Sequence, residues 1–298
     1  MNLAVIMELP LVVLDVQRGG PATGLPTKSE QTDLLQALFG RNGESPMPVM
    51  AAMSPTDCFD AAYEASKVAL ENMTPVVLLT DAYVANGSGA FKLPDLAAYP
   101  AINPPYVPEE LKGEWTPYMR AKRNEDGSLT RDENGTRYWA VPGREGFEHI
   151  LGGLEKDDKT GAISTNPENH DLMTRKRQAK IDAIPVPDLE VLGDKDDADL
   201  LIVGFGGTYG HLRAAMDEMR AQGNKVAMAH FRYINPLPKN TAEVMKKYPK
   251  VVVAEQNMGQ LAGWLRMKVD GFVPEQFNQV KGQPFVVSEL VEAFSKLV

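Results

Sequence analysis

Residues 11–33 read LVVLDVQRGGPATGLPTKSEQTD, an apolar run followed by a loop of glycines and prolines. The run at 11–14 (LVVL) predicts a buried strand. In α/β proteins, ligand sites lie outside the carboxyl ends of the strands, where this loop is expected. Arg18 supplies a planar fork of donors that can bind a carboxylate or phosphate at two points. The stretch therefore predicts an α/β fold with a small-anion site in this loop.

Several other residues of the loop suit such a site. The glycine pair after Arg18 permits positive φ and leaves room for a ligand beside the backbone N–H groups. Pro21 and Pro26 restrict the unbound loop, which lowers the entropic cost of ordering it. We therefore predict that Arg18 and Thr23 bind substrate, although an ordinary surface ion pair remains the alternative for Arg18. The predicted supporting residues are Gly19, Gly20, Pro21, Gly24 and Thr27.

Thr27 and Glu30 have the T-x-x-E spacing of a capping box. This spacing predicts that a helix begins near residue 29 and continues to about 39. Glu30 is therefore interpreted as a helix cap rather than as a catalytic base.

Strands and helices alternate through the first hundred residues. After the first strand (11–16) and the helix near 29–39, apolar runs at 48–52 and 75–80 predict two more strands, with a helix at about 55–72 between them. This βαβαβ pattern implies a parallel sheet with right-handed crossovers. Asp81, Tyr83 and Asn86 follow the third strand and should share the edge that carries Arg18. They are candidates for a cofactor contact or an interface, and bonding to the backbone of its own turn is the alternative for Asp81.

The chain changes character from about residue 94 to 187. Prolines cluster near residue 100, and Asp126-Gly127 and Asn134-Gly135 predict two tight turns between polar strands. A linker at 184–190 leads into a second α/β unit. Its predicted strands are 199–203, 225–230 and 251–254, and its predicted helices are roughly 209–222, 239–247, 258–268 and 287–297. We expect units at 1–105 and 186–298, joined by an irregular connecting segment at 106–185.

Composition restricts the partners and the compartment. The 298 residues carry a net charge of −9, which argues against nucleic acid or an anionic membrane as the main partner. No apolar run reaches the roughly 20 residues that a membrane-spanning helix needs, and the N-terminus lacks the features of a signal peptide. The single cysteine, Cys58, excludes an internal disulfide or an all-cysteine cluster within this chain, and it is expected to be a buried, inert thiol. We expect a cytoplasmic protein.

Two further patterns carry less weight. The glycine run 204–210 (GFGGTYG) follows a strand and opens a helix, but its spacing departs from the dinucleotide fingerprint. A tight strand–helix turn is the favoured interpretation, with nucleotide binding as the alternative. His149 and His170 lie among acidic residues at a spacing that fits no compact metal motif, so capping or hairpin roles are favoured.

The sequence resembles the α subunit of the 2-oxoacid:ferredoxin oxidoreductases, and the 2-oxoglutarate branch in particular. The resemblance covers essentially the whole chain. It rests on the stretches at 16–36, 77–88 (VLLTDAYVANGS), 146–170 (GFEHILGGLEKDDKTGAISTNPENH), 204–210, 231–238 (FRYINPLP) and 254–266 (AEQNMGQLAGWLR).

This resemblance implies a subunit of a thiamine diphosphate enzyme that converts a 2-oxoacid and CoA to acyl-CoA and CO₂, with ferredoxin as electron acceptor. It implies a pyrimidine-side domain followed by a domain like the C-terminal domain of transketolase. The arginine of the family's VQRGGP motif, thought to hold the substrate carboxylate, corresponds to Arg18. A separate β subunit is expected to supply the Mg²⁺ and diphosphate site, the iron–sulfur cluster and the ferredoxin contact. An inactive scaffold, or a module that binds an anion or nucleotide, is the alternative function.

The sequence also departs from this family. A preceding domain, a Y-P-I-T-P-type stretch and the glutamate that activates the thiamine pyrimidine are absent from this sequence. The pyrimidine-side domain is therefore expected to be incomplete, with an unpaired sheet edge and uncovered apolar surface. The chain by itself is expected to be inactive.

Overall fold

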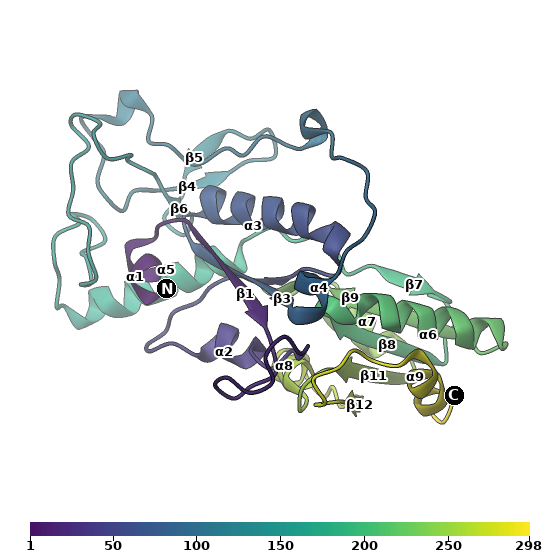
Figure 1. Ribbon diagram of the computed structural model, residues 1–298. Coiled ribbons are helices and arrows are strands. Elements are labelled where there is room, and N and C mark those ends of the chain that lie inside the picture. Colours follow the sequence, from purple (N-terminus) through teal and green to yellow (C-terminus); the bar gives the residue numbers. More distant parts are fainter.

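The computed structural model describes residues 1–298 (Figure 1). Its first sheet has the order β1-β3-β2-β10. The strands β1 (Leu11–Gln17), β2 (Val49–Ala51) and β3 (Pro75–Asp81) are parallel, and β3 is buried along its whole length. This arrangement confirms the predicted βαβαβ unit.

Helices cover both faces of this sheet. On one face, Val76 and Leu78 of β3 share an apolar cluster with Ala61 and Ala65 of α3 (Cys58–Asn72). The alternate residues of β3, such as Leu79, share another cluster with α2 (Leu34–Phe39). Figure 1 shows α3 and α2 on opposite sides of the strands. Successive side chains of a strand point to opposite faces of the sheet, so a strand with helices on both faces is buried on both sides. This explains why β3 is so apolar.

The second sheet has the order β12-β11-β8-β9-β7. All of its pairings are parallel except that between β7 and β9. The strands predicted for this unit are confirmed as β8, β9 and β11, and the predicted helices as α6 to α9. Their bounds are β7 (Val191–Gly193), β8 (Leu200–Phe205), α6 (Tyr209–Ala221), β9 (Val226–Phe231), α7 (Thr241–Lys247), β11 (Lys250–Glu255), α8 (Gln260–Lys268), β12 (Glu275–Asn278) and α9 (Val287–Phe294).

The two sheets are joined through one core. Strand β10 (Tyr233–Asn235) leaves the second unit and pairs antiparallel with β2 of the first sheet. A single cluster of 29 buried apolar residues contains Leu34 and Leu79 from the first unit, together with Phe205 and Trp264 from the second. This shared core fixes the position of the strand ends of one sheet relative to those of the other.

The middle of the chain contains a small antiparallel sheet of order β5-β4-β6. The predicted turns at Asp126-Gly127 and Asn134-Gly135 fall between β4 (Arg120–Arg123), β5 (Leu129–Arg131) and β6 (Thr136–Arg137). Gly127 has a φ of 83°, a conformation that glycine adopts without strain. The hairpin interpretation of this segment is confirmed.

Two predictions for the stretch at 27–39 are wrong. The helix begins at Leu34 instead of residue 29, and the residues before it form an irregular segment. The capping box does not form, because Thr27 has a φ of 64° and Glu30 is buried outside any helix. Tertiary contacts of residues 29–32, described below, take the place of helical hydrogen bonds.

Three α-helices were not predicted. Helix α1 (Asn2–Met7) is short and buries only Val5. Helix α5 (Pro167–Asp182) buries Lys176, Arg177 and Lys180 along with Met173 and Ile181, so its core-facing side lacks a clear apolar stripe. The third is the short α4 (Ala82–Asn86). The remaining short elements are the 3₁₀ turns η1 (Pro55–Asp57), η2 (Leu96–Ala98), η3 (Glu109–Leu111) and η4 (Gly206–Thr208).

Strand β1 forms an open edge of the first sheet. It pairs only with β3, and Leu11, Leu14 and Val16 are 42 %, 60 % and 44 % exposed. This is the unpaired edge and uncovered apolar surface that the sequence predicts. None of the helices combines the length and the apolar composition needed to cross a bilayer.

Candidate functional site at the carboxyl ends of the strands

The loop after β1 and the helix after β3 leave the sheet side by side. Gln17 of β1 pairs with Asp81 of β3, so Arg18 and Ala82 are the first residues beyond a shared edge. Phe205, at the end of β8, and Gln256, after β11, both hydrogen bond to Gln31 in the segment before α2. Four strand ends from two sheets therefore meet in one region.

Residues 18–28 form a closed loop. The N–H of Gly19 donates to the carbonyl of Lys28 at 2.9 Å, and the N–H of Leu25 donates to the carbonyl of Gly19 at 2.9 Å. A Cβ at Gly24 would lie 2.2 Å from the carbonyl oxygen of Gly19, so only glycine fits there. Residues 20–28 are exposed, and the peptide bond between Gly20 and Pro21 is cis. The loop thus has a defined shape and projects from the molecule.

Arg18 is half-buried at the base of this loop. Its Nη1 donates to the carbonyl of Thr23 at 2.9 Å, and its Nη2 donates to the carbonyl of Ala22 at 3.3 Å. No carboxylate of this chain pairs with Arg18, so the surface ion pair considered as an alternative does not form. Nε and one N–H on each terminal nitrogen have no acceptor in the chain. The guanidinium supports the loop and retains free donors, and its role in substrate binding stays a prediction.

The predicted supporting residues contribute mainly through their backbone. Thr23 offers its carbonyl to Arg18, and no hydrogen bond uses its exposed hydroxyl. Gly19 closes the loop, Gly24 fits its tightest point, and Thr27 takes a positive φ. Substrate binding by Thr23 is therefore also a prediction.

Asp81 is a buried junction between the two units. It is 1 % exposed, and it caps α4 by accepting from the N–H of Val84 at 3.0 Å. It also accepts from the N–H of Gly207 at 3.0 Å and from the hydroxyl of Ser29 at 3.3 Å. Burial raises the pKa of Asp81, and these donors oppose the shift. Asp81 thus bonds to the backbone of its own turn, as the alternative for it predicts, and its cofactor or interface role stays a prediction.

Tyr83 and Asn86 lie on α4 at the same edge. Tyr83 is 42 % exposed, and its ring lies 4.9 Å from that of His211 on α6. The side chain of Asn86 donates to the carbonyl of Ala82 at 2.8 Å, within its own helix. Both residues are accessible to a partner, and their predicted cofactor or interface role stays a prediction.

Gln31 joins the loop to the second unit and was not identified from the sequence. It is fully buried, with Nε2 donating to the carbonyl of Phe205 at 2.6 Å and Oε1 accepting from the N–H of Gln256 at 3.1 Å. Its backbone N–H donates to the carbonyl of Gln256 at 3.0 Å, and its carbonyl accepts from Asn257 at 2.8 Å. The polar run at 255–257, directly after a predicted strand, was the available signal for this junction.

The glycine run 204–210 forms the favoured tight turn. Gly206 has a φ of 60°, and a Cβ on Gly207 would lie 2.3 Å from a carboxylate oxygen of Asp81. Residues 206–208 are buried. Because Gly207 has no side chain, the carboxylate of Asp81 can approach the backbone at the start of α6.

Asp15 and Asp33 are two further titratable groups near this edge. Burial and the charge of Asp33 raise the pKa of Asp15 to about 6. Burial also raises the pKa of Asp33. Asp15 therefore titrates near neutral pH at the open edge of the sheet.

The remaining candidates lie elsewhere. Cys58 begins α3 and is only half-buried, so the expectation of a buried thiol is wrong, and its Sγ donates to the carbonyl of Ser54 at 3.3 Å. His170 contacts Glu155 at 2.9 Å, and His149 contacts Arg137 at 3.0 Å. No group of three or more His, Cys, Asp or Glu side chains is arranged to hold a metal ion.

These features define an α/β protein of parallel sheets whose candidate site is built by loops at the carboxyl ends of its strands. Residues 1–175 match the profile of the pyruvate flavodoxin/ferredoxin oxidoreductase, thiamine diphosphate-binding family. Residues 198–289 match the pyruvate:ferredoxin oxidoreductase core domain II. The chain belongs to this family of oxidoreductases.

Individual relatives agree with this assignment. The chain is 50 % identical to the 2-oxoglutarate oxidoreductase subunit KorA of Mycobacterium tuberculosis, over 97 % of this chain and 42 % of that protein. It is 30 % identical to the α subunit of a 2-oxoacid:ferredoxin oxidoreductase of Aeropyrum pernix, over 100 % of this chain and 45 % of the relative.

A solved structure has the same fold. The 2-oxoglutarate:ferredoxin oxidoreductase from Magnetococcus marinus, with 2-oxoglutarate, coenzyme A and succinyl-CoA bound, matches with a TM-score of 0.86 and 32 % identity. The match covers 99 % of this chain and 50 % of that one. The chain thus spans half or less of the length of these relatives.

Proposed function

We propose that this chain forms part of the α subunit of a thiamine diphosphate-dependent 2-oxoacid:ferredoxin oxidoreductase. The proposed reaction converts 2-oxoglutarate, CoA and oxidised ferredoxin to succinyl-CoA, CO₂ and reduced ferredoxin. The identity to a 2-oxoglutarate oxidoreductase subunit supports this choice of substrate. The structural observation that carries the proposal is the position of Arg18, half-buried, without a carboxylate partner and at the shared edge of β1 and β3.

In this proposal Arg18 binds a carboxylate of the 2-oxoacid. Two of its N–H groups hold the carbonyls of Ala22 and Thr23, which fixes the orientation of the guanidinium. The free donors then form charge-assisted hydrogen bonds to the acid, and the rigid loop reduces the entropy lost on binding. Arg18 acts in this way by positioning the substrate.

The chain's residues fit one side of a shared cofactor site. Exposed Tyr83 and the exposed loop leave room for a partner surface at the edge where Arg18 lies. Thiamine diphosphate, when bound, supplies the electron sink for cleavage of the carbon–carbon bond. We propose that the β subunit carries Mg²⁺, the iron–sulfur cluster and the ferredoxin contact. The single cysteine and the net charge of −9 support this division.

The proposal also concerns the organisation of the chain. We propose a thiamine pyrimidine-side unit at 1–105, a connecting segment at 106–185 and a second unit at 186–298. We further propose that another polypeptide segment pairs with the open edge of β1, and that the chain alone is inactive. Burial of the exposed side chains of Leu11, Leu14 and Val16 would favour such pairing.

A cytoplasmic location is part of the proposal, and cell fractionation tests it.

The test uses the assembled enzyme that contains this chain. Its 2-oxoglutarate- and CoA-dependent turnover is measured with thiamine diphosphate, Mg²⁺ and ferredoxin or a dye acceptor. Arg18→Lys keeps the charge but removes the planar fork. We expect kcat/KM to fall by roughly tenfold to a hundredfold, as for a lost charge-assisted pair. The matched control is Arg175→Lys, at an exposed arginine paired with Asp171, which should leave kcat/KM unchanged.

A second candidate function has its own observation. Because Arg18 donates to two carbonyls of its loop, it could serve only to hold that loop in an inactive scaffold or an anion-binding module. Unchanged kcat/KM in Arg18→Lys would exclude Arg18 from the substrate site. An assembly that forms but never turns over 2-oxoacids would favour the scaffold.

A further inference from the structure

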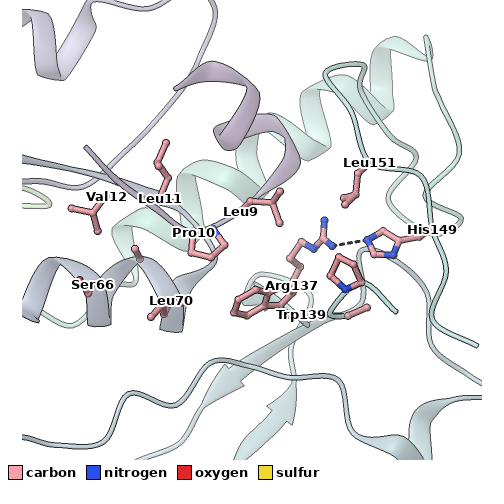
Figure 2. Close-up of a pocket in the computed structure, with 13 residues that line it drawn as sticks. Leu9, Pro10, Leu11, Val12, Ser66, Leu70, Arg137, Trp139, His149 and Leu151 are labelled. Atoms are coloured by element: carbon pink, nitrogen blue, oxygen red, sulfur yellow. Dashed lines mark hydrogen bonds between the residues drawn. The ribbon is translucent and has the colours of Figure 1, made fainter. Parts of the chain in front are cut away.

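A cavity lies at the opposite end of β1 from Arg18. Its volume is about 520 Å³, and it opens between the start of β1, α3 and the connecting segment (Figure 2). Exposed Leu11, Pro142 and Leu151 lie at its rim. Most of the lining is apolar, and it consists of Leu9, Pro10, Leu11, Val12, Ser66, Ala69, Leu70, Arg137, Trp139, Ala140, Pro142, His149 and Leu151.

One side of this cavity carries a buried guanidinium. Arg137 is 1 % exposed, and Figure 2 shows its side chain between Leu9, Trp139 and His149. Its Nη1 donates to the carbonyl of Met7 at 3.0 Å, and its Nη2 contacts Nε2 of His149 at 3.0 Å. Its Nε is buried without any acceptor. Arg137 forms no ion pair with a carboxylate of this chain.

The neighbouring charges do not neutralise Arg137. The only buried carboxylate close to it, that of Glu8, is already paired with Arg120 and with Lys180. The Nζ of Lys156, also buried, donates only to the carbonyls of Gly152 and Leu154, and the neighbouring Glu155 is paired with Arg177. The region therefore holds more buried cations than anions. An unpaired buried charge is costly, and an anion beside it is correspondingly favoured.

His149 adds no negative charge. Its Nδ1 lies 3.0 Å from the carbonyl of Phe147, which can only accept, so this nitrogen carries the proton. Nε2 is then the acceptor for Arg137. Burial lowers the pKa of His149, with the charge of Arg137 acting in the same direction. The neutral imidazole orients the guanidinium and leaves its charge unbalanced.

We propose that this cavity binds an amphiphilic carboxylate, with the acid group at Arg137 and an apolar chain along Leu9, Leu70 and Trp139. The apolar walls favour the hydrocarbon chain of the ligand, and the unbalanced guanidinium favours its acid group. This site is separate from the edge that carries Arg18, and its occupancy does not depend on the proposed reaction.

Octanoate is the probe for this site, and octan-1-ol is its uncharged counterpart. Binding to the full chain is measured by titration calorimetry, a readout that needs no turnover. We expect saturable binding of octanoate, roughly tenfold or more tighter than octan-1-ol, because a charge-assisted contact contributes at that scale. Equal affinity for the two probes, or no saturable binding of octanoate, overturns the proposal.

Two variants with matched controls locate the binding. Arg137→Met removes the charge, and Ser66→Phe places a ring in the cavity from α3. The controls are Arg131→Met, at an exposed arginine of β5, and Ala62→Phe, at an exposed position one turn earlier on α3. We expect roughly tenfold weaker octanoate binding in the first two and unchanged binding in the controls. If Arg137→Met fails to fold, the affinity of Ser66→Phe for octanoate and the comparison of octanoate with octan-1-ol test the proposal. Unchanged affinity in Ser66→Phe overturns the assignment to this cavity.

Discussion

The carboxylate of Glu8 lies 2.7 Å from Nζ of Lys180, and both side chains are almost completely buried. Glu8 ends α1 with a φ of 49°, and its other carboxylate oxygen pairs with Arg120 of β4. Lys180 also donates to the carbonyl of Met73 at 2.9 Å, where α3 ends. One carboxylate thus connects the N-terminal helix, the small sheet and α5 to the first sheet.

Glu8→Gln is expected to destabilise the protein strongly. The substitution preserves the shape of the side chain but leaves Arg120 and Lys180 as buried cations without an anion. Removing one partner of a buried ion pair costs about 3–5 kcal/mol. Urea unfolding should show this loss in Glu8→Gln but not in Glu110→Gln, an exposed control that forms no ion pair. A loss below about 1 kcal/mol would mean that water or a rearrangement compensates the charges.

Protonation of Glu8 is expected to destabilise the fold at low pH. Burial alone would raise the pKa of Glu8, but Arg120 and Lys180 outweigh it and hold that pKa well below its usual range. A depressed carboxyl pKa stabilises the fold above the unfolded-state pKa, and this stabilisation is lost as the pH falls below it. Acid unfolding of the wild type should therefore be steeper below about pH 4.5 than that of Glu8→Gln.

Gly207→Ala is expected to weaken the junction between the two sheets. Its Cβ would lie 2.3 Å from Oδ2 of Asp81, the atom that accepts from the N–H of Gly207 at 3.0 Å. Overpacking at such a site costs about 1–3 kcal/mol. Gly210→Ala is the matched control, because nothing lies within 4 Å of its Cβ and α6 tolerates alanine well. Equal stability of the two variants would contradict the close packing of Asp81.

The sequence predicted the parts of the fold that local patterns encode. The apolar runs 75–80 and 200–203 predicted buried strands, and the Asp-Gly and Asn-Gly pairs predicted the turns of the small sheet. Helix α5 was missed because Lys176, Arg177 and Lys180 occupy its buried side, so the apolar period is absent. Its N-terminal signals, Asn166 as cap and Pro167 in the first turn, were present in the sequence.

Tertiary contacts decided what the sequence could not predict. The segment before α2 has a capping-box spacing, but hydrogen bonds from Ser29 and Gln31 to residues more than 170 positions away hold it outside a helix. The pairing of β10 with the first sheet depends on a similar long-range contact. Arg18 could be placed at a strand end from the sequence, whereas its two bonds to loop carbonyls required the folded loop.

Gln31→Met tests the importance of this junction. The substitution keeps the volume but leaves the N–H of Gln256 without a partner, and it removes one of the two donors to the carbonyl of Phe205, the other being the hydroxyl of Thr208. Each buried unsatisfied group costs about 1–3 kcal/mol. Thermal unfolding should show a clear loss for Gln31→Met and almost none for Gln178→Met, an exposed residue whose side chain bonds only within α5. A small loss at position 31 would show that the loop packs on the second sheet without these bonds.

Asp15→Asn is expected to stabilise the protein at neutral and alkaline pH. Burial and the charge of Asp33 raise the pKa of Asp15 to about 6, above its unfolded value of about 3.9. The folded state therefore binds the proton more tightly, and this contribution to stability is present below the unfolded pKa and lost as the pH rises through about 6. Asparagine is neutral throughout, so the stability of the variant relative to wild type should increase between about pH 4 and pH 7. Urea unfolding across that range measures the difference, with exposed Asp188→Asn as control. A difference that does not change with pH would show that Asp15 is solvated like an ordinary surface carboxylate.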